Sequence, residues 1–245
     1  MARRGAMSEF CKTLSSTFII DVLKEQCSPS RWQRMNEILD QRITSLALGL
    51  EDLNHSHNAT ACLRTAESLG LQDVVAIELR NEYPLPEEIN MTPRTHRKLS
   101  MHAHHWIELH RLKTTETIVE WAAQRNMRIL GTSPHANKTL ADIEMDTPAM
   151  VLFGNEKDGL REHSMALCDE TFKLPMYGFS ESFNLSVCAG MVLSTLGQKR
   201  RDALAQQGLT GDLPDERKQQ LLAKWLVRDI RGSELMLKRV LAELN

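Results

Sequence analysis

Three short polar segments contain the residue types that could bind a ligand or carry out chemistry. The first places the amide of Asn58 six residues before the guanidinium of Arg64. The second is GNEKDG over residues 154–159, and the third is LPMYGFSESFNLS over residues 174–186. Glycines let a backbone approach a ligand closely, and the amide, carboxylate and hydroxyl groups suit a polar one. These segments therefore predict a polar ligand site.

Each candidate side chain also has a simpler possible role. Asn58, Ser182 and Asn184 are residue types that commonly cap the start of a helix, where the side chain accepts a backbone hydrogen bond. Arg64 could be an ordinary surface cation, and a pair of glycines is common in turns. The residue types alone leave both interpretations open.

The elements around these segments predict an α/β fold. Short apolar runs indicate buried strands, and helical patterns lie between them. The strands are expected at 74–77, 127–130, 149–153 and 171–174, and the helices at 63–69, 114–125 and 185–204. This alternation predicts a mostly parallel sheet with helices on both faces. Ligands bind such sheets at the carboxyl ends of the strands, where Gly131, Gly154 and Pro175 follow the apolar runs.

Both ends of the chain are expected to be helical extensions of this core. Residues 31–49 have apolar side chains at helical spacing with Gly49 as a stop, whereas residues 1–30 show no clear period and predict a loose extension. After a linker at 208–214, the chain predicts one or two amphipathic helices. These could present a solvated face or form an arm that docks on the core or a partner. The expected divisions are 1–50, 51–205 and 206–245.

Composition is that of an ordinary globular protein. The chain has 245 residues, 42% hydrophobic and 25% charged, and no run approaches the roughly 18 apolar residues of a membrane helix. Its five cysteines form no CxxC pair, which favours reduced thiols in a cytoplasmic protein.

Charge is distributed unevenly along the chain. Lys and Arg against Asp and Glu number 7 to 5 in residues 1–50, 13 to 20 in 51–198, and 10 to 7 in 199–245. The total of -2 therefore conceals basic flanks around an acidic middle.

The usual signatures of nucleotide and metal sites are missing from the sequence. It contains no GxGxxG, P-loop or HExxH pattern, which disfavours a Rossmann site. Four histidines cluster near Trp106, namely His102, His104, His105 and His110. Imidazoles can bind metals, but no cysteine or paired carboxylate joins them at ligand spacing. We therefore expect ordinary packing or surface histidines and no metal.

The three polar segments, in their order and spacing, resemble the motifs of the SpoU-type RNA 2′-O-ribose methyltransferases. The family forms are N-x5-RT, G-x-E-x-x-G and LPM-x-G-x-x-x-SLN-x-S, and the match covers roughly residues 31–205. The preceding helix and the basic tail are similar to the tRNA guanosine-2′-O-methyltransferase branch. Phe183 replaces the usual Leu, and residues 179–181 also depart from the branch.

The resemblance implies S-adenosylmethionine as methyl donor and a C-terminal trefoil knot whose loops hold it. The implied donor-binding residues are Leu130, Gly131, Thr132, Gly154, Asn155, Glu156, Leu174, Met176 and Leu185. It assigns Arg64 to the ribose hydroxyl, with Asn58, Glu156, Ser182 and Asn184 positioning the reacting groups. Arg64 could relay the proton with help from an RNA phosphate, or stay charged and stabilise the developing alkoxide.

The resemblance also implies partners. We expect a homodimer with no membrane attachment, acting on tRNA and most specifically on a guanosine of the D-loop. Two alternatives stay open, a ribosomal RNA methyltransferase and a non-catalytic RNA-binding protein on the same fold.

Overall fold

A computed structural model describes residues 9–83, 103–180 and 182–244, and His102 and Glu181 lie outside them. The chain divides into two compact units. Ile43–Gly211 forms one of them, and the segment that ends at Arg42 joins the segment that starts at Asp212 in the other. The sequence-based boundary after residue 50 differs from this division because residues 46–50 are part of a central strand.

The larger unit is built on one parallel sheet. Its strands are β1 (Leu46–Glu51), β2 (Asp73–Ile77), β3 (Glu108–Leu112), β4 (Arg128–Thr132), β5 (Lys138–Thr139), β6 (Ala149–Phe153) and β7 (Glu170–Lys173). They follow the order β3-β2-β1-β6-β4-β7-β5, and every pairing is parallel. The predicted α/β sheet is confirmed. Sequence reasoning missed β3, in which three of the five residues are polar and which is half-buried throughout.

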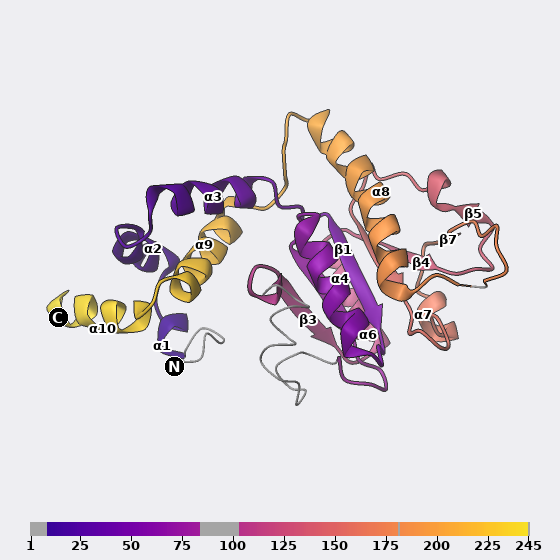
Figure 1. Cartoon of the computed structure of the whole chain (residues 1–245), viewed down its shortest axis with the longest axis horizontal. Coiled ribbons are helices and arrows are strands. Elements are labelled where there is room, and N and C mark those ends of the chain that lie inside the picture. Colours follow the sequence, from indigo (N-terminus) through magenta and orange to yellow (C-terminus); the bar gives the residue numbers. More distant parts are fainter. Residues whose placement is uncertain (1–8, 84–102, 181, 245) are drawn as a thin grey trace. The chain divides into compact units, whose positions relative to one another are not determined.

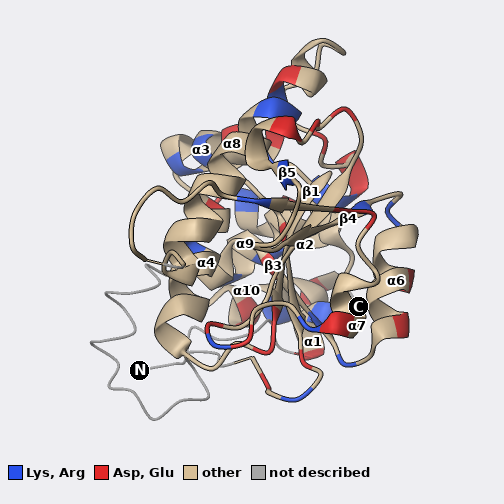
Figure 2. Cartoon of the chain, turned by 90° about the vertical axis from the view of Figure 1, so that its right-hand side faces the viewer, with Lys and Arg blue, Asp and Glu red and all other residues tan. Residues whose placement is uncertain are grey.

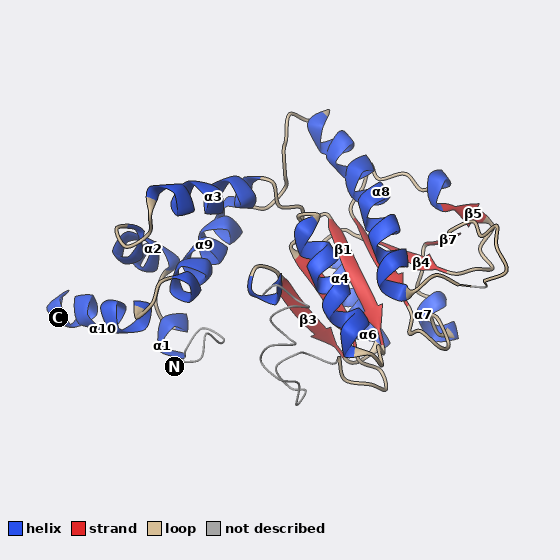
Figure 3. Ribbon diagram, in the orientation of Figure 1, coloured by secondary structure: helices blue, strands red, loops and turns tan. Residues whose placement is uncertain are grey.

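Helices cover both faces of this sheet (Figures 1 and 3). They are α4 (Ser56–Ser68), α6 (Thr115–Ala123), α7 (Glu162–Met165) and α8 (Leu185–Ala205), with short 3-10 turns η1 (Ala103–His105) and η2 (Leu140–Asp142). Successive strand residues point to opposite faces. In β1, Leu46, Leu48 and Leu50 belong to the core cluster with α4 and α8. Ala47 belongs to the second cluster, with Ile118 of α6.

Two helices on opposite faces of the sheet, α6 and α8, begin at polar caps. Thr114 caps α6 by accepting a hydrogen bond from the backbone N–H of Thr117 at 3.2 Å. Asn184 caps α8 by accepting from the N–H of Ser186 at 2.9 Å. These caps satisfy backbone donors that the first helical turn leaves unpaired.

The smaller unit is all helical. Its helices are α1 (Glu9–Lys12), α2 (Ser16–Lys24), α3 (Pro29–Asp40), α9 (Asp215–Asp229) and α10 (Ser233–Leu244). The predicted helix at 31–49 is wrong in its second half. It ends at Asp40 because the following apolar run LALGL is buried in the sheet. Residues 16–24 are helical and capped by Ser15, which corrects the expectation of a loose extension.

Ion pairs join the two ends of the chain within the smaller unit. Arg31 donates two hydrogen bonds to Asp229, at 3.1 and 2.9 Å, and Lys218 lies 2.9 Å from Asp40. The sequence of this unit, residues 1–42 and 212–245, holds 14 Lys and Arg against 11 Asp and Glu. Blue segments on α3 in Figure 2 show part of this charge. The terminal segments therefore form one unit with a small positive charge, whereas Lys199, Arg200 and Arg201 of the basic C-terminal flank lie on α8 of the larger unit.

Within the described ranges, no helix is both long enough and apolar enough to cross a membrane.

Candidate active site

A cavity of about 680 Å³ opens where the carboxyl ends of β4, β6 and β7 meet the start of α8. Three stretches of chain supply most of its wall: the residues after β4, the loop after β6 and the segment from the end of β7 into α8. The lining residues are Thr132, Ser133, Pro134, His135, Phe153, Gly154, Asn155, Glu156, Lys157, Asp158, Gly159, Leu160, Met165, Phe172, Lys173, Leu174, Met176, Ser182, Phe183, Asn184, Leu185 and Cys188. The site thus lies at the predicted edge of the sheet.

The loop after β6 needs both of its glycines. A Cβ on Gly154 would lie 1.8 Å from the carbonyl carbon of Gly159, so the two backbone segments touch there. Gly159 has a φ of 68°, a left-handed conformation that favours glycine. The Asn155 carboxamide oxygen accepts from the N–H groups of Lys157 and Asp158, at 2.9 and 2.7 Å. The loop is therefore a tight turn that brings backbone to the cavity wall.

A chain of side-chain hydrogen bonds links all three polar segments. The Asn58 Nδ2 of α4 donates to Glu156 Oε1 at 2.7 Å, and Asn184 Nδ2 donates to Asn58 Oδ1 at 3.2 Å. Asn58 is buried, and Glu156 and Asn184 both line the cavity. His55, not Asn58, occupies the N-cap position of α4. The Asn58 side chain therefore connects elements rather than capping its own helix.

The structure brings most of the proposed donor-binding residues together and leaves two aside. The residues on the cavity wall are Thr132, Gly154, Asn155, Glu156, Leu174, Met176 and Leu185. Leu130 and Gly131 are buried inside β4, and Leu130 belongs to the core. A Cβ on Gly131 would lie 2.6 Å from Cys168 Sγ, so close packing explains this glycine. Those two residues are therefore part of the packed interior and not of the cavity wall.

The proposed catalytic residues are placed in different ways. Ser182 lines the cavity and is exposed, as is the Asn184 side chain. Arg64 lies on α4, exposed, and is not part of the cavity wall. Its exposure leaves its guanidinium accessible to a bound macromolecule.

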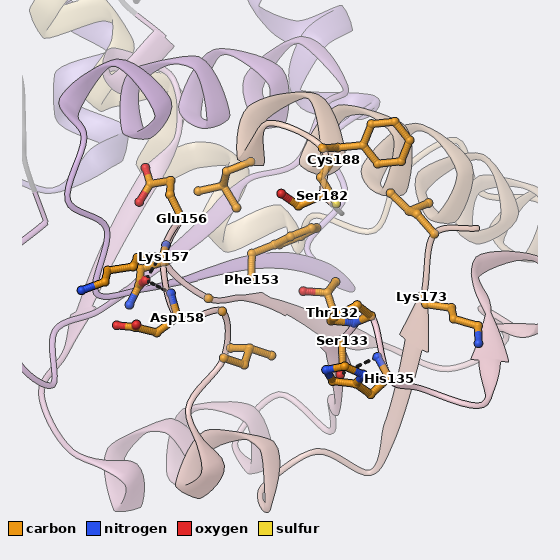
Figure 4. Close-up of a pocket in the computed structure, with 18 of the residues that line it drawn as sticks. Thr132, Ser133, His135, Phe153, Glu156, Lys157, Asp158, Lys173, Ser182 and Cys188 are labelled. Carbon is orange, nitrogen blue, oxygen red and sulfur yellow. Dashed lines mark hydrogen bonds between the residues drawn. The ribbon is translucent and has the colours of Figure 1, made fainter. Parts of the chain in front are cut away.

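The cavity carries both charge signs and apolar walls. In Figure 4, Glu156 and Asp158 lie on one side of the view, and His135 and Lys173 lie on the other. Leu160, Phe172, Leu174 and Leu185 add apolar surface. A ligand with an apolar ring, a positive centre and further polar groups would find complementary surfaces here.

Two thiols near the site are held in the neutral form. Burial raises the pKa of Cys188, which lines the cavity, to about 11. Burial, with the nearby Glu156 carboxylate, raises the pKa of Cys62 to about 12. None of the five cysteines forms a disulfide. Neither thiol is an activated nucleophile at neutral pH.

Sequence reasoning missed much of the wall. Ser133, Pro134 and His135 directly follow the strand end that was singled out, so continuing past Thr132 would have found them. Lys173 and Cys188 gave no local signal, because they reach the cavity through the packing of β7 and α8.

The clustered histidines that the structure describes contact a carboxylate or one another. His110 Nε2 lies 2.6 Å from Asp73 Oδ1, and the rings of His104 and His105 are 4.1 Å apart. In the part of the chain that the structure describes, no three His, Cys, Asp or Glu side chains group so as to hold a metal ion.

Comparison with known families gives a match over the site. The model of the "SpoU rRNA Methylase family" matches residues 45–194, which include all three polar segments.

Named relatives are similar over most of the chain. A "tRNA (guanosine(18)-2'-O)-methyltransferase" of Borreliella burgdorferi is 29% identical, over 74% of this chain and 79% of its own. A "23S rRNA (guanosine-2'-O-)-methyltransferase RlmB" of Pseudomonas aeruginosa is 32% identical, over 71% of this chain and 69% of its own. Relatives named for tRNA and relatives named for ribosomal RNA thus have similar sequence identity to this chain.

Solved structures share the fold. The A. aeolicus TrmH/SpoU tRNA modifying enzyme has a TM-score of 0.69 at 21% identity, covering 85% of this chain and 98% of its own. The SpoU methyltransferase AviRb from Streptomyces viridochromogenes, in complex with the cofactor AdoMet, has a TM-score of 0.56 at 20% identity. That match covers 66% of this chain and 62% of the other.

Proposed function

Because this chain belongs to the SpoU rRNA methylase family, we propose that it transfers a methyl group from S-adenosylmethionine to the 2′-hydroxyl of a guanosine ribose in tRNA. The observation that carries this proposal is the hydrogen-bonded connection between Asn58, Glu156 and Asn184 at one cavity. It joins the three polar segments at the carboxyl edge of the sheet, where ligands of parallel sheets bind.

The residues present fit the proposed donor. Close backbone approach at Gly154 lets main-chain groups line the cavity, which suits the adenine and methionine portions of the molecule. Leu160, Leu174 and Leu185 offer apolar contact to a purine ring. The Glu156 carboxylate offers an opposite charge to a sulfonium. The complex of the structurally similar AviRb with AdoMet supports this choice of donor.

When bound, S-adenosylmethionine supplies an activated methyl group on a sulfonium. The new bond joins that carbon to the ribose 2′-oxygen, the carbon–sulfur bond breaks, and the hydroxyl proton is released, so a neutral thioether remains. The chain's main task is alignment, which can supply roughly 7–11 kcal/mol in well-oriented reactions. We assign that task to Asn58, Glu156, Ser182 and Asn184.

Arg64 is proposed to act on the ribose oxygen. A guanidinium keeps its proton because its pKa is above about 12, which makes stabilisation of the developing negative charge its natural role. The exposure of Arg64 on α4 supports access by the RNA. An RNA phosphate beside it would still allow a proton relay, as the second possible role.

A tRNA substrate is favoured by the helical unit. The terminal segments of the chain come together there and carry a net positive charge, which suits phosphate contacts outside the cavity. The similarity to the tRNA-modifying A. aeolicus enzyme covers 85% of this chain. The second candidate function is 2′-O-methylation of ribosomal RNA, which the 32% identical Pseudomonas relative supports.

We propose that the protein works as a homodimer in the cytoplasm. Tyr177, Phe179, Phe183 and Val187 form a run of exposed apolar side chains from the loop after β7 into α8. Such a surface next to a site is typical of an interface. Five cysteines without a disulfide agree with a reducing compartment. The trefoil knot implied by the family resemblance stays a prediction for the same segment.

Incubation with donor labelled in its methyl group, with tRNA and ribosomal RNA as separate substrates, tests this function. The expected result is label in tRNA that maps to a guanosine ribose. Label in ribosomal RNA alone would establish the second candidate. No label in either RNA, from protein that binds the donor, would point to a non-catalytic RNA-binding role.

A further inference from the structure

Two buried carboxylates face one arginine, Arg161, which follows the cavity-lining residue Leu160 in the sequence. Glu51 ends β1, Asp52 follows it, and both are essentially inaccessible to solvent, while the Arg161 side chain is 12% exposed. Arg161 Nη2 lies 3.1 Å from Asp52 Oδ2, and its Nε lies 3.6 Å from Glu51 Oε1. The backbone N–H of Arg161 also donates to Glu51 Oε1, at 3.3 Å. Arg161 is therefore held to β1 through both its main chain and its side chain.

Arg161 immediately follows the segment Gly154–Leu160, which we call the donor loop because every one of its residues lines the cavity. The loop is held at its start by β6 and at its end by Arg161. Arg161 itself is not among the lining residues, so it has no direct path to the ligand.

Backbone groups that follow β2 also hold Asp52 in place. Its Oδ1 accepts from the backbone N–H groups of Arg80 and Asn81, at 2.7 and 3.0 Å, just beyond β2. Its φ of 48° is a left-handed conformation that is uncommon outside glycine, asparagine and aspartate. Asp52 thus joins the exits of β1 and β2 to the end of the donor loop.

We propose that Arg161 is a positioning residue that fixes the donor loop for methyl-donor binding through its ion pair with Asp52. This inference rests on the proposed function, because it takes the cavity as the donor site. Substitution of one partner of a buried ion pair has a different effect from substitution of both partners. Loss of one partner leaves an unpaired buried charge, whereas replacement of both by neutral groups is often tolerated. A positioning role therefore predicts a non-additive pattern in donor affinity.

The test measures the dissociation constant for S-adenosylmethionine by calorimetry and methyl transfer at saturating donor and RNA. We expect Arg161→Ala to weaken donor binding about tenfold or more and to leave kcat within about twofold. Asp52→Asn should weaken binding in the same direction. The double variant Asp52→Asn with Arg161→Gln should bind donor at least as well as the single variant Arg161→Gln, which a simple sum of the two single losses would not produce. Arg161→Lys, which keeps the charge, should lose the least.

A matched control separates positioning from general stability. Arg128 is also partly buried and forms an ion pair with Glu170, but at the opposite ends of their strands from the cavity. Arg128→Ala should lower the thermal unfolding midpoint and leave the donor dissociation constant unchanged.

The outcomes are distinct. Wild-type protein that binds no donor overturns the proposed function. If wild type binds donor and Arg161→Ala, folded as judged by its unfolding midpoint, binds it equally well, the positioning role is wrong. Strictly additive losses in the double variant would overturn it as well. A fall in kcat without a change in donor affinity would equally overturn it.

Discussion

Asn58 and Glu156, 98 residues apart in the chain, are joined by a hydrogen bond of 2.7 Å from the amide nitrogen to the carboxylate. Asn58 is buried in α4, and Glu156 projects from the loop that lines the cavity. Because an amide accepts at its oxygen while it donates at its nitrogen, Asn58 also receives the hydrogen bond of Asn184 at 3.2 Å. One side chain thus sets the orientation of two cavity residues.

Asn58→Ala should reduce methyl transfer strongly. Hydrogen bonds to charged groups contribute about 1.5–3 kcal/mol, so loss of this donor to Glu156 predicts a fall in kcat/KM of roughly ten- to a hundredfold. Asn58→Asp, which is nearly isosteric, places a second carboxylate beside Glu156 and should reduce activity at least as much. Steady-state methylation assays measure both. Wild-type activity in Asn58→Asp would show that this contact does not matter for turnover.

Gly154→Ala should abolish donor binding. Its Cβ would lie 1.8 Å from the Gly159 carbonyl carbon, which is backbone and cannot rotate away, so the donor loop would have to move. Calorimetric titration with S-adenosylmethionine measures the effect. Gly178→Ala is the matched control, because nothing lies within 4 Å of a Cβ at that position. Equal donor binding by both alanine variants would contradict the tight-turn explanation.

Arg64→Ala should lose methyl transfer while it retains donor binding. The side chain lies outside the cavity wall, and its proposed partner is the ribose oxygen rather than the donor. Single-turnover transfer to tRNA and calorimetric donor titration separate the two effects. Near-normal turnover in this variant would refute the assignment of Arg64 to the reaction.

Arg231→Gln should weaken RNA binding and reduce its dependence on salt. Arg231 is an exposed cation of the basic helical unit. Each phosphate contact that is lost lowers the slope of log affinity against log salt by about one. Fluorescence titration with tRNA at several salt concentrations gives this slope, and Arg231→Lys should preserve it. An unchanged slope in Arg231→Gln, with donor affinity as in wild type, would exclude a phosphate contact at this position.

Cys188 should react slowly with alkylating reagents and faster as pH rises. Its pKa is raised to about 11 by burial, so the thiolate fraction is small at neutral pH and grows about tenfold per pH unit below that value. Peptide mass spectrometry after timed labelling at pH 7, 8 and 9 measures the rate. S-adenosylmethionine should protect Cys188, which lines the cavity, and leave Cys27 labelling unchanged. Equal labelling of Cys188 with and without donor would contradict its place in the site.

The sequence alone was sufficient for the features that depend on neighbouring residues. Apolar runs predicted β2, β4 and β6 because buried strands of parallel sheets are nearly continuously apolar. The strand expected at 171–174 overlaps β7, in which only Phe172 is buried. The polar segments after those runs identified the cavity edge, since a parallel sheet puts all its carboxyl ends on one side. The prediction of a single helix over residues 31–49 was wrong after Asp40, where the chain enters β1. Apolar residues at helical spacing and a buried strand cannot be told apart over so short a run.

Only the tertiary structure decided which distant residues meet. The connection of Asn58 to Glu156 and Asn184 depends on how α4 and α8 pack on the same sheet face, which no local pattern encodes. The order in which β6 lies between β1 and β4 is likewise a result of long-range pairing. Two basic ends that looked like separate extensions fold together into one helical unit. The burial of Asp52 against Arg161 arises in the same way, because a charge is held inside a protein when a partner from elsewhere in the chain reaches it.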